Sequence, residues 1–202
     1  NRLYQVLTNV HAAIARERAP EPLLAAVCQI MVRDGGLRMA WIGRPDTENQ
    51  ELVPVAWAGK TGDYLDTPHA SLAAGPRGHA PSAQAFREGR AMHSTDIGSD
   101  PGMATWREGA LALGYRSSSA YPLKSRGRTV GVFTMYSSAI QFFDAGELAL
   151  LERLSEDIGH ALESYELAEE RERAVTDLRD SEARFATMFR MSTSGLGLAR
   201  FE

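Results

Sequence analysis

The sequence predicts an α+β fold in which antiparallel hairpins alternate with helices and a long helix follows at the C-terminal end. Three observations lead to this fold class. Apolar residues recur every three or four positions in the first thirty residues, which is a helical period. Apolar runs with a period of two follow in pairs, as in hairpins, and a helical period then continues from about residue 144 to residue 190.

The composition is that of an ordinary water-exposed domain rather than a nucleic-acid-binding or membrane protein. The 202 residues contain 22 Lys and Arg against 26 Asp and Glu, for a net charge of -4. A domain that binds phosphate backbones has clustered basic residues, so no nucleic-acid partner is predicted. A membrane span needs about 18 consecutive apolar residues, and no window approaches that length. We therefore expect no direct membrane contact, and the single cysteine favours a cytoplasmic location.

The first two predicted helices cover residues 3–15 and 23–32, and the second ends at Gly35 and Gly36. Cys28 occupies a core spacing on the second helix. No His or Lys lies at helical spacing beside it to stabilise a thiolate. We therefore predict a small buried hydrophobe rather than a reactive thiol.

Five short runs are predicted to be strands: 37–43, 52–58, 91–97, 115–123 and 129–137. Helices are predicted at 82–89 and 103–113. The segment 59–81 is rich in Gly, Pro and His and has little periodicity. Loops of this length in a compact domain are usually functional, so this one is a candidate cover for a pocket.

The last helix is too long for a domain of this size to bury. At 1.5 Å per residue it would extend about 65 Å. Its apolar residues alternate at spacings of three and four, the seam of a coiled coil: Leu151, Leu154, Ile158, Ala161, Tyr165, Ala168 and Val175. The flanking residues are charged, which favours a parallel homodimer through this helix. The alternative is a solvated linker helix, because Glu172 and Arg179 interrupt the seam.

No motif predicts catalysis. Phosphate-binding glycine loops, a zinc-protease helix and a nucleophile elbow are all missing from the sequence. No two of the five histidines share a helical face at a spacing of four, so no metal site is predicted. The sequence therefore predicts a non-catalytic regulatory fragment.

Aromatic and small polar residues gather in or beside the predicted strands, as in a small-molecule pocket. Large rings enclose a planar ligand, while hydroxyls and a carboxylate orient it. The wider group includes three consecutive serines at 117–119 and Thr134. The residues selected as ligand-binding are Trp41, Asp96, Trp106, Tyr115, Ser119 and Tyr121. Period two leaves open which strand face lines the pocket, and the alternative is that these rings are simply core.

Several segments in order resemble the GAF domains of bacterial multidomain signalling proteins. They include Met-Ala-Trp-Ile-Gly at 39–43, the run from Gly89 to Ile97, Gly-Tyr-Arg-Ser-Ser at 114–118 and Phe-Asp-Ala-Gly-Glu at 143–147. The resemblance defines a sensor domain at 1–162. A coiled-coil signalling helix at 163–184 would follow, and 185–202 resembles the start of a PAS domain.

The resemblance implies an antiparallel sheet of about six strands with helices on both faces. Two terminal helices would lie on one face, and a ligand pocket under helices and loops on the other. The signature of cyclic-nucleotide-binding members is missing here. Cys28 lies in the second helix rather than in the pocket region where bilin-carrying members attach their chromophore, and the cysteines of methionine-sulfoxide-reducing members are missing. Haem through His79 or His93 stays open, so the cofactor is unidentified.

Two functions therefore compete. In the first, the domain is a sensor that binds a small molecule and relays a conformational change through a dimeric coiled coil to output domains. In the second, it is a ligand-free dimerisation and spacer module. The chain begins without Met and ends in a strand-like run at 199–202, so we expect a piece of a longer polypeptide.

Overall fold

The computed structural model describes residues 2–66, 70–73 and 75–195 and divides into two units, Asn1–Glu163 and Ser164–Glu202. The first unit is the α+β domain, and it contains two N-terminal helices, five strands, two further helices and the beginning of the last helix. In chain order these are α1 (Arg2–Arg16), α2 (Pro20–Arg33), β1 (Met39–Asp46), β2 (Glu51–Gly59), α3 (Pro81–Glu88), β3 (Met92–Ser94), α4 (Arg107–Ala112), β4 (Ser117–Ser125), β5 (Arg128–Ser137) and α5 (Ala145–Gly195).

The described strands form one antiparallel sheet in the order β2-β1-β5-β4-β3. The two hairpins place β5 at the centre and leave β2 and β3 at the edges. The resemblance implied about six strands, and the sheet has five among the described residues. Beside β2, where another strand could pair, the described residues make only an isolated bridge between Glu51 and Ser71. The Gly- and Pro-rich composition of the following loop explains why pairing stops there.

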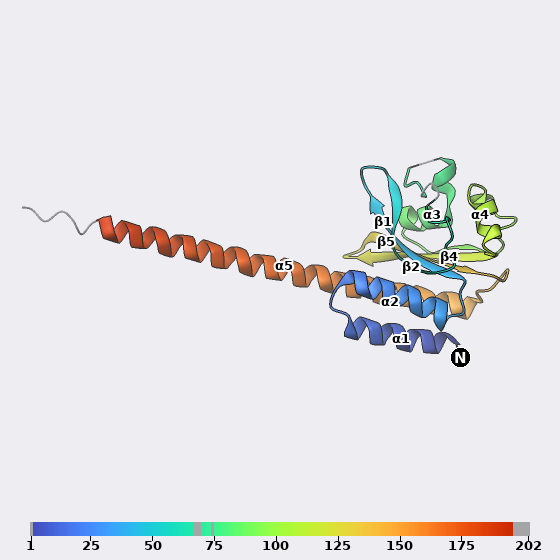
Figure 1. Cartoon of the computed structure of the whole chain (residues 1–202), viewed down its shortest axis with the longest axis horizontal. Helices are drawn as coiled ribbons and strands as arrows, with labels where there is room; N and C mark the ends of the chain where they lie inside the picture. Colours follow the sequence, from blue (N-terminus) through green and yellow to red (C-terminus); the bar gives the residue numbers. More distant parts are fainter. Residues whose placement is uncertain (1, 67–69, 74, 196–202) are drawn as a thin grey trace, which may run out of the picture. The chain divides into compact units, whose positions relative to one another are not determined.

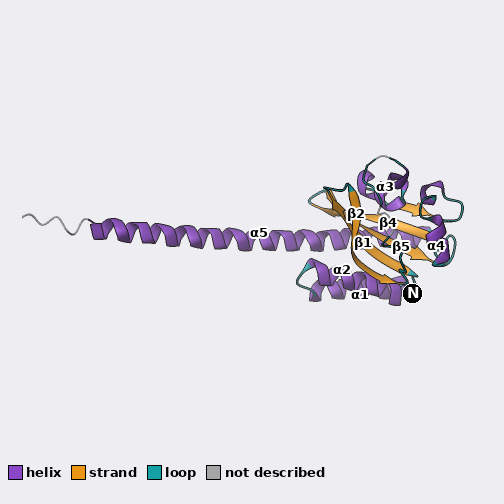
Figure 2. Cartoon of the chain, turned by 45° about the horizontal axis from the view of Figure 1, so that its top comes forward, coloured by secondary structure: helices purple, strands orange, loops and turns teal. Residues whose placement is uncertain are grey.

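Helices cover both faces of this sheet (Figures 1 and 2). The α1 and α2 helices and the beginning of α5 lie on one side, which we name the helix face, and α3 lies on the other, which we name the cavity face. The Tyr121 hydroxyl donates to the carbonyl of Leu148 in α5 at 3.4 Å, which identifies the helix face of β4. Because side chains alternate along a strand, the neighbours of Tyr121 in sequence lie on the cavity face.

Apolar spacing explains the N-terminal helices. In α1 the buried residues are Leu3, Val6, Val10 and Ala13, one stripe of three- and four-residue steps. Proline in its first turn starts α2, where a missing N–H costs nothing. Cys28 is fully buried in α2, and burial raises the pKa of its thiol to about 12. The cysteine is therefore a core side chain, as its spacing predicted.

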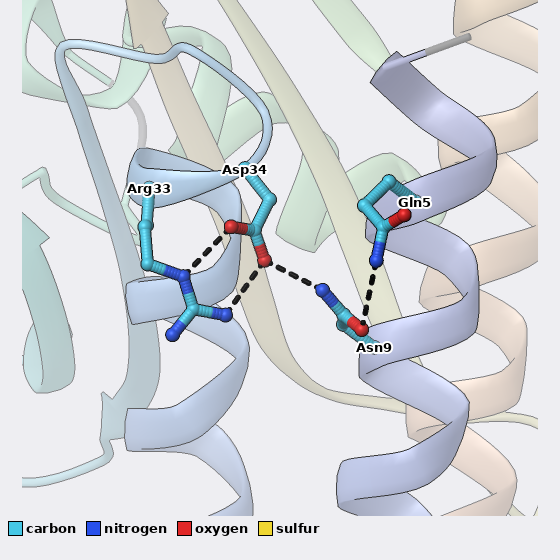
Figure 3. Close-up of polar contacts among 4 residues, drawn as sticks. All are labelled: Gln5, Asn9, Arg33 and Asp34. Atoms are coloured by element: carbon cyan, nitrogen blue, oxygen red, sulfur yellow. Dashed lines mark hydrogen bonds and ion pairs between the residues drawn. The ribbon is translucent and has the colours of Figure 1, made fainter.

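A polar chain ties the end of α2 to α1 (Figure 3). Asp34 receives two hydrogen bonds from the Arg33 guanidinium at 2.7 Å and one from the Asn9 amide at 2.7 Å. Gln5 in turn donates to Asn9 at 3.3 Å. The hydrogen bonds from Arg33 and Asn9 lower the pKa of the Asp34 carboxyl from 3.8 to about 2.

This shift predicts a pH dependence. A carboxyl whose pKa is lower in the folded chain stabilises the fold above its unfolded pKa, and that contribution is lost as the pH falls through about 2. Between pH 4 and pH 2, urea midpoints should therefore fall less steeply for Asp34→Asn than for the wild type. Glu108→Gln, which removes an exposed carboxylate from α4, is the control. Equal slopes for all three proteins would contradict the role of Asp34.

The second unit contains the remainder of α5. Its large apolar side chains are exposed: Leu167, Val175, Leu178, Phe185 and Met188. The segment that resembles the start of a PAS domain is helical to Gly195, and residues 196–202 lie outside the described part of the chain. None of the described helices combines the length and the apolar character that a membrane crossing requires.

Candidate functional site

A cavity lies on the cavity face of the sheet. Its volume, counted as space open to the centre of a water molecule, is about 40 Å³. Strand residues form its floor, and residues from the segments before α3 and α4 cover it. The lining consists of Trp41, Leu52, Pro54, Tyr64, Leu65, Ala70, Ala80, Pro81, Ser82, Met103, Trp106, Ser118, Thr134 and Tyr136.

Strand register positions the floor residues. Ser118 of β4 pairs with Tyr136 of β5, and Thr134 of β5 pairs with Trp41 of β1. Paired residues of antiparallel strands point to the same face, and residues two apart on one strand do so as well. All four side chains therefore point into the cavity from the three inner strands. Gly43 follows two residues after Trp41, and a side chain there would collide with the indole, so the ring depends on this glycine.

Unsatisfied polar atoms are the most informative feature of this face. Four buried side-chain atoms have no hydrogen-bond partner among the described residues: Trp41 Nε1, Ser94 Oγ, Ser118 Oγ and Thr134 Oγ1. Three of these residues line the cavity, and Ser94 pairs with Ser118 on the same face. A buried hydroxyl without a partner costs about 1–3 kcal/mol, and such groups are rare in folded proteins. Their concentration on one face therefore indicates a place for a bound polar molecule.

Three tyrosines pack beside this floor. The rings of Tyr115 and Tyr136 stack at 4.7 Å, and Tyr64 meets both edge-on. The hydroxyls of Tyr64 and Tyr136 lie 3.3 Å apart. Burial raises the pKa of both phenols above 10, so they are neutral at physiological pH. The cavity is therefore aromatic, polar at a few points and uncharged.

The six residues predicted from the sequence to bind a ligand lie in four places. Trp41 and Trp106 line the cavity. Tyr115 is fully buried behind Tyr136, and its hydroxyl donates to the Lys60 carbonyl rather than to the cavity. Three of the predicted aromatic residues therefore lie on the cavity face. Two of them, Trp41 and Trp106, line the cavity, whereas Tyr115 packs behind Tyr136.

Ser119 and Tyr121 lie on the helix face. The Ser119 hydroxyl is 2.8 Å from His93 Nδ1, and Tyr121 contacts α5 through the Leu148 carbonyl. Asp96 closes a turn, where its carboxylate accepts hydrogen bonds from Gly98 N and Ser99 Oγ at 3.0 Å each. These three selected residues are therefore separated from the cavity.

Among the lining residues that were not predicted to bind a ligand, Ser118, Thr134 and Tyr136 come from β4 and β5. Ser118 and Thr134 belonged to the wider polar group, but the alternation of β4 leaves the choice between Ser118 and Ser119 open. One signal was available. The set that contains Tyr121, Leu123, Phe133 and Met135 is the more apolar, and the more apolar face packs against long helices.

The candidate haem ligands do not meet the cavity. His93 points to the helix face, where burial lowers its pKa, and the exposed His79 is not among the lining residues. Within the described ranges, no group of three or more His, Cys, Asp or Glu side chains could hold a metal ion. The residues present therefore do not fit a histidine-ligated haem.

The described strands form a five-stranded antiparallel sheet with a cavity on one face and helices on the other, which defines a small α+β domain. The family model described as GAF domain matches residues 17–163, so the chain belongs to the GAF domain family. None of the curated proteins compared with the chain matches it.

Solved structures share this fold at low sequence identity. The GAF domain of a phosphoenolpyruvate-protein phosphotransferase from Coxiella burnetii is 14% identical, with a TM-score of 0.66 over 86% of this chain and 97% of that one. The free methionine-R-sulfoxide reductase from Neisseria meningitidis, solved with its substrate, is 22% identical, with a TM-score of 0.67 over 82% of this chain and 91% of that one.

The second of these structures corrects one prediction. The sequence contains no catalytic motif and therefore predicted a non-catalytic fragment, and that prediction was wrong. The fold is shared with an enzyme, and also with the corresponding reductase of Staphylococcus aureus, 13% identical at a TM-score of 0.63 over 79% of this chain and 94% of that one. Membership of the family is therefore compatible with catalysis as well as with regulation.

Proposed function

We propose that this GAF domain is the sensor of a signalling protein and binds a small polar molecule in the cavity floored by β1, β5 and β4. The observation that carries this proposal is the set of buried, unpartnered polar atoms at Trp41, Ser118 and Thr134. A domain that only spaced its neighbours would gain stability from apolar residues at these positions. The spacer alternative leaves the cost of these polar atoms unexplained.

Strand β4 connects the cavity with the helix proposed to carry the signal. Ser118 faces the cavity, whereas its neighbours Ser119 and Tyr121 face α5, to which Tyr121 is hydrogen-bonded. At the end of the same strand, the Arg126 amide donates to Glu163 of α5 at 3.4 Å. A ligand that shifts β4 would therefore also move the contacts that β4 makes with α5. A two-state relay requires such an element, which contacts both the ligand site and the output helix.

Thermal-shift screening of the 202-residue chain against a metabolite library tests the sensor proposal. A ligand at 100 times its Kd stabilises the folded state by about 2.7 kcal/mol. We expect at least one uncharged small molecule to raise the Tm, and Ser118→Ala/Thr134→Val to remove that rise. A library without any stabilising compound would favour the spacer.

The second unit supports a homodimer as the proposed partner arrangement. Leu167, Leu178 and Phe185 are exposed by 51%, 60% and 66% of their surface. Steps of eleven and seven residues place them on nearly the same side of a helix, because α-helices turn about 100° per residue. Met188 and Ala174 extend this stripe at coiled-coil spacings. Long helices with one exposed apolar stripe are marginal alone in water, and an identical helix offers the matching stripe.

Lysine substitution tests this dimer. Leu178→Lys/Phe185→Lys removes two apolar side chains per chain from the proposed seam and adds like charges, so we expect dimer dissociation to increase by about 100-fold or more. The matched control is Thr176→Lys/Thr187→Lys, which adds the same charges about 200° around the helix from Leu178 and Phe185 respectively. Analytical ultracentrifugation measures both. Unchanged sedimentation of the first variant would support the solvated linker helix.

A further inference from the structure

The chemistry of the cavity wall restricts the class of ligand, provided that the cavity binds one as proposed above. None of the fourteen described lining residues has a side chain that is charged at neutral pH. A buried ion without a counter-charge is strongly disfavoured, because the wall cannot replace its hydration. Phosphates, carboxylates and ammonium groups placed wholly within this cavity would meet no counter-charge among the described lining residues.

The polar atoms indicate how a neutral molecule would be oriented. Ser118 and Thr134 are diagonal neighbours on β4 and β5, because Ser118 pairs with Tyr136 and Thr134 pairs with Ala120. Such diagonal positions bring the side chains within about 7–8 Å of each other. Each hydroxyl can donate one hydrogen bond and accept others. A molecule with a donor and an acceptor on adjacent atoms would satisfy both.

The walls and the volume restrict shape and size. Four of the lining residues, Trp41, Tyr64, Trp106 and Tyr136, are aromatic, which favours a flat ligand. One water needs roughly 10–15 Å³ of space on this measure, so about 40 Å³ accommodates three or four waters. At roughly 30 Å³ of liquid volume each, these waters together occupy about 90–120 Å³, so a single ring is the largest ligand that this space could hold.

From these three features we infer that the ligand is an uncharged, single-ring nitrogen heterocycle or ring carboxamide, hydrogen-bonded by Ser118 and Thr134 between aromatic walls. This inference rests on the proposed function and narrows it to one chemical class. It predicts discrimination by charge among molecules of equal shape. It also predicts discrimination by hydrogen-bonding capacity among rings of similar size.

Isothermal titration of the full chain with nicotinamide, nicotinate and toluene tests both points. Nicotinamide and nicotinate have nearly the same shape, but only nicotinate is an anion at pH 7. We expect nicotinamide to bind at least about 100-fold more tightly than nicotinate, because the wall offers no counter-charge. Toluene can pack against the aromatic residues of the cavity, but it leaves the hydroxyls of Ser118 and Thr134 without a hydrogen-bond partner. We therefore expect toluene to bind at least about tenfold more weakly than nicotinamide.

Variants localise the binding. Ser118→Ala/Thr134→Val should weaken nicotinamide by about tenfold or more, whereas Ser119→Ala, on the same strand but on the helix face, should leave its Kd unchanged. The comparison among the three probes needs only the wild type, so it stands even where a variant fails to fold. Loss of nicotinamide binding in Ser119→Ala alone would overturn the assignment of the hydroxyls.

The remaining outcomes separate the two proposals. Nicotinate binding as tightly as nicotinamide, with loss in Ser118→Ala/Thr134→Val, would overturn the uncharged class and keep the sensor. Toluene binding as tightly as nicotinamide would overturn the role of the hydroxyls. The absence of binding by all three probes at millimolar concentration would overturn the ligand class. Only a metabolite screen that also shows no stabilisation would overturn the sensor.

Discussion

Replacing Ser118 by alanine and Thr134 by valine should raise the free energy of unfolding of the unliganded domain by about 1–3 kcal/mol. Both hydroxyls are at least 98% buried and have no hydrogen-bond partner among the described residues. Valine has nearly the shape of threonine, so Thr134→Val removes a desolvated hydroxyl without opening a cavity. The expected result is a gain of stability together with a loss of binding, the trade-off typical of a functional site.

Urea denaturation measures this gain as a higher midpoint at an unchanged m-value. The matched control is Ser119→Ala on the same strand. Its hydroxyl is hydrogen-bonded to His93 at 2.8 Å, so its removal should lower stability by about 1 kcal/mol. If the two cavity substitutions destabilise the domain as much as Ser119→Ala does, their hydroxyls are satisfied in the free protein. The hydroxyls of Ser118 and Thr134 would then give no support for a bound ligand.

Gly159→Ala should lower the free energy of unfolding by about 1–3 kcal/mol, although alanine is the better helix former by about 1 kcal/mol. Gly159 is buried in the part of α5 that belongs to the first unit. A Cβ there would collide with the carbonyl oxygen of Lys124 and lie 3.1 Å from its backbone nitrogen. Both atoms are backbone at the end of β4, so neither can turn away as a side chain would.

Thermal and urea unfolding of Gly159→Ala measure this loss. Gly146→Ala is the control, because Gly146 lies exposed in the first turn of the same helix, where an added Cβ meets only the Asp144 carboxylate at 3.3 Å. Its stability should stay equal or rise by up to about 1 kcal/mol. Equal behaviour of the two variants would show that α5 and β4 separate easily. The relay proposed through β4 would then lose its rigid contact.

The order of helices and strands could be read from local pattern. The two N-terminal helices, the two hairpins and the long last helix follow from periods of 3.6 and two, because backbone hydrogen bonding imposes those periods on any buried segment. Counting those runs already predicts five strands. The resemblance suggested about six strands, and among the described residues of the loop that follows β2 only Ser71 forms a bridge with that strand.

The sequence predicted the candidate site only in part, because the period along a strand describes local residues and not what packs against them. Of the predicted ligand-binding residues, Trp41 and Trp106 line the cavity, whereas Ser119 and Tyr121 lie on the opposite face. A period of two divides a strand into two sets of side chains, and it does not state which set meets the helices. Asp96 was predicted to orient a ligand through its carboxylate, but that carboxylate accepts a hydrogen bond from Gly98 N in a turn.

The sequence by itself determined the fold class, the strand order along the chain, the buried place of Cys28 and the apolar spacing of α5, because each depends on residues close together in the chain. Only the tertiary structure decided which hydroxyls face the cavity, and that Ser118 and Thr134 stay unpartnered there. Hydrogen-bond satisfaction depends on every group that folding brings near an atom. For these two side chains the relevant groups come from β1, β4, β5 and the segments covering them, which no local period connects.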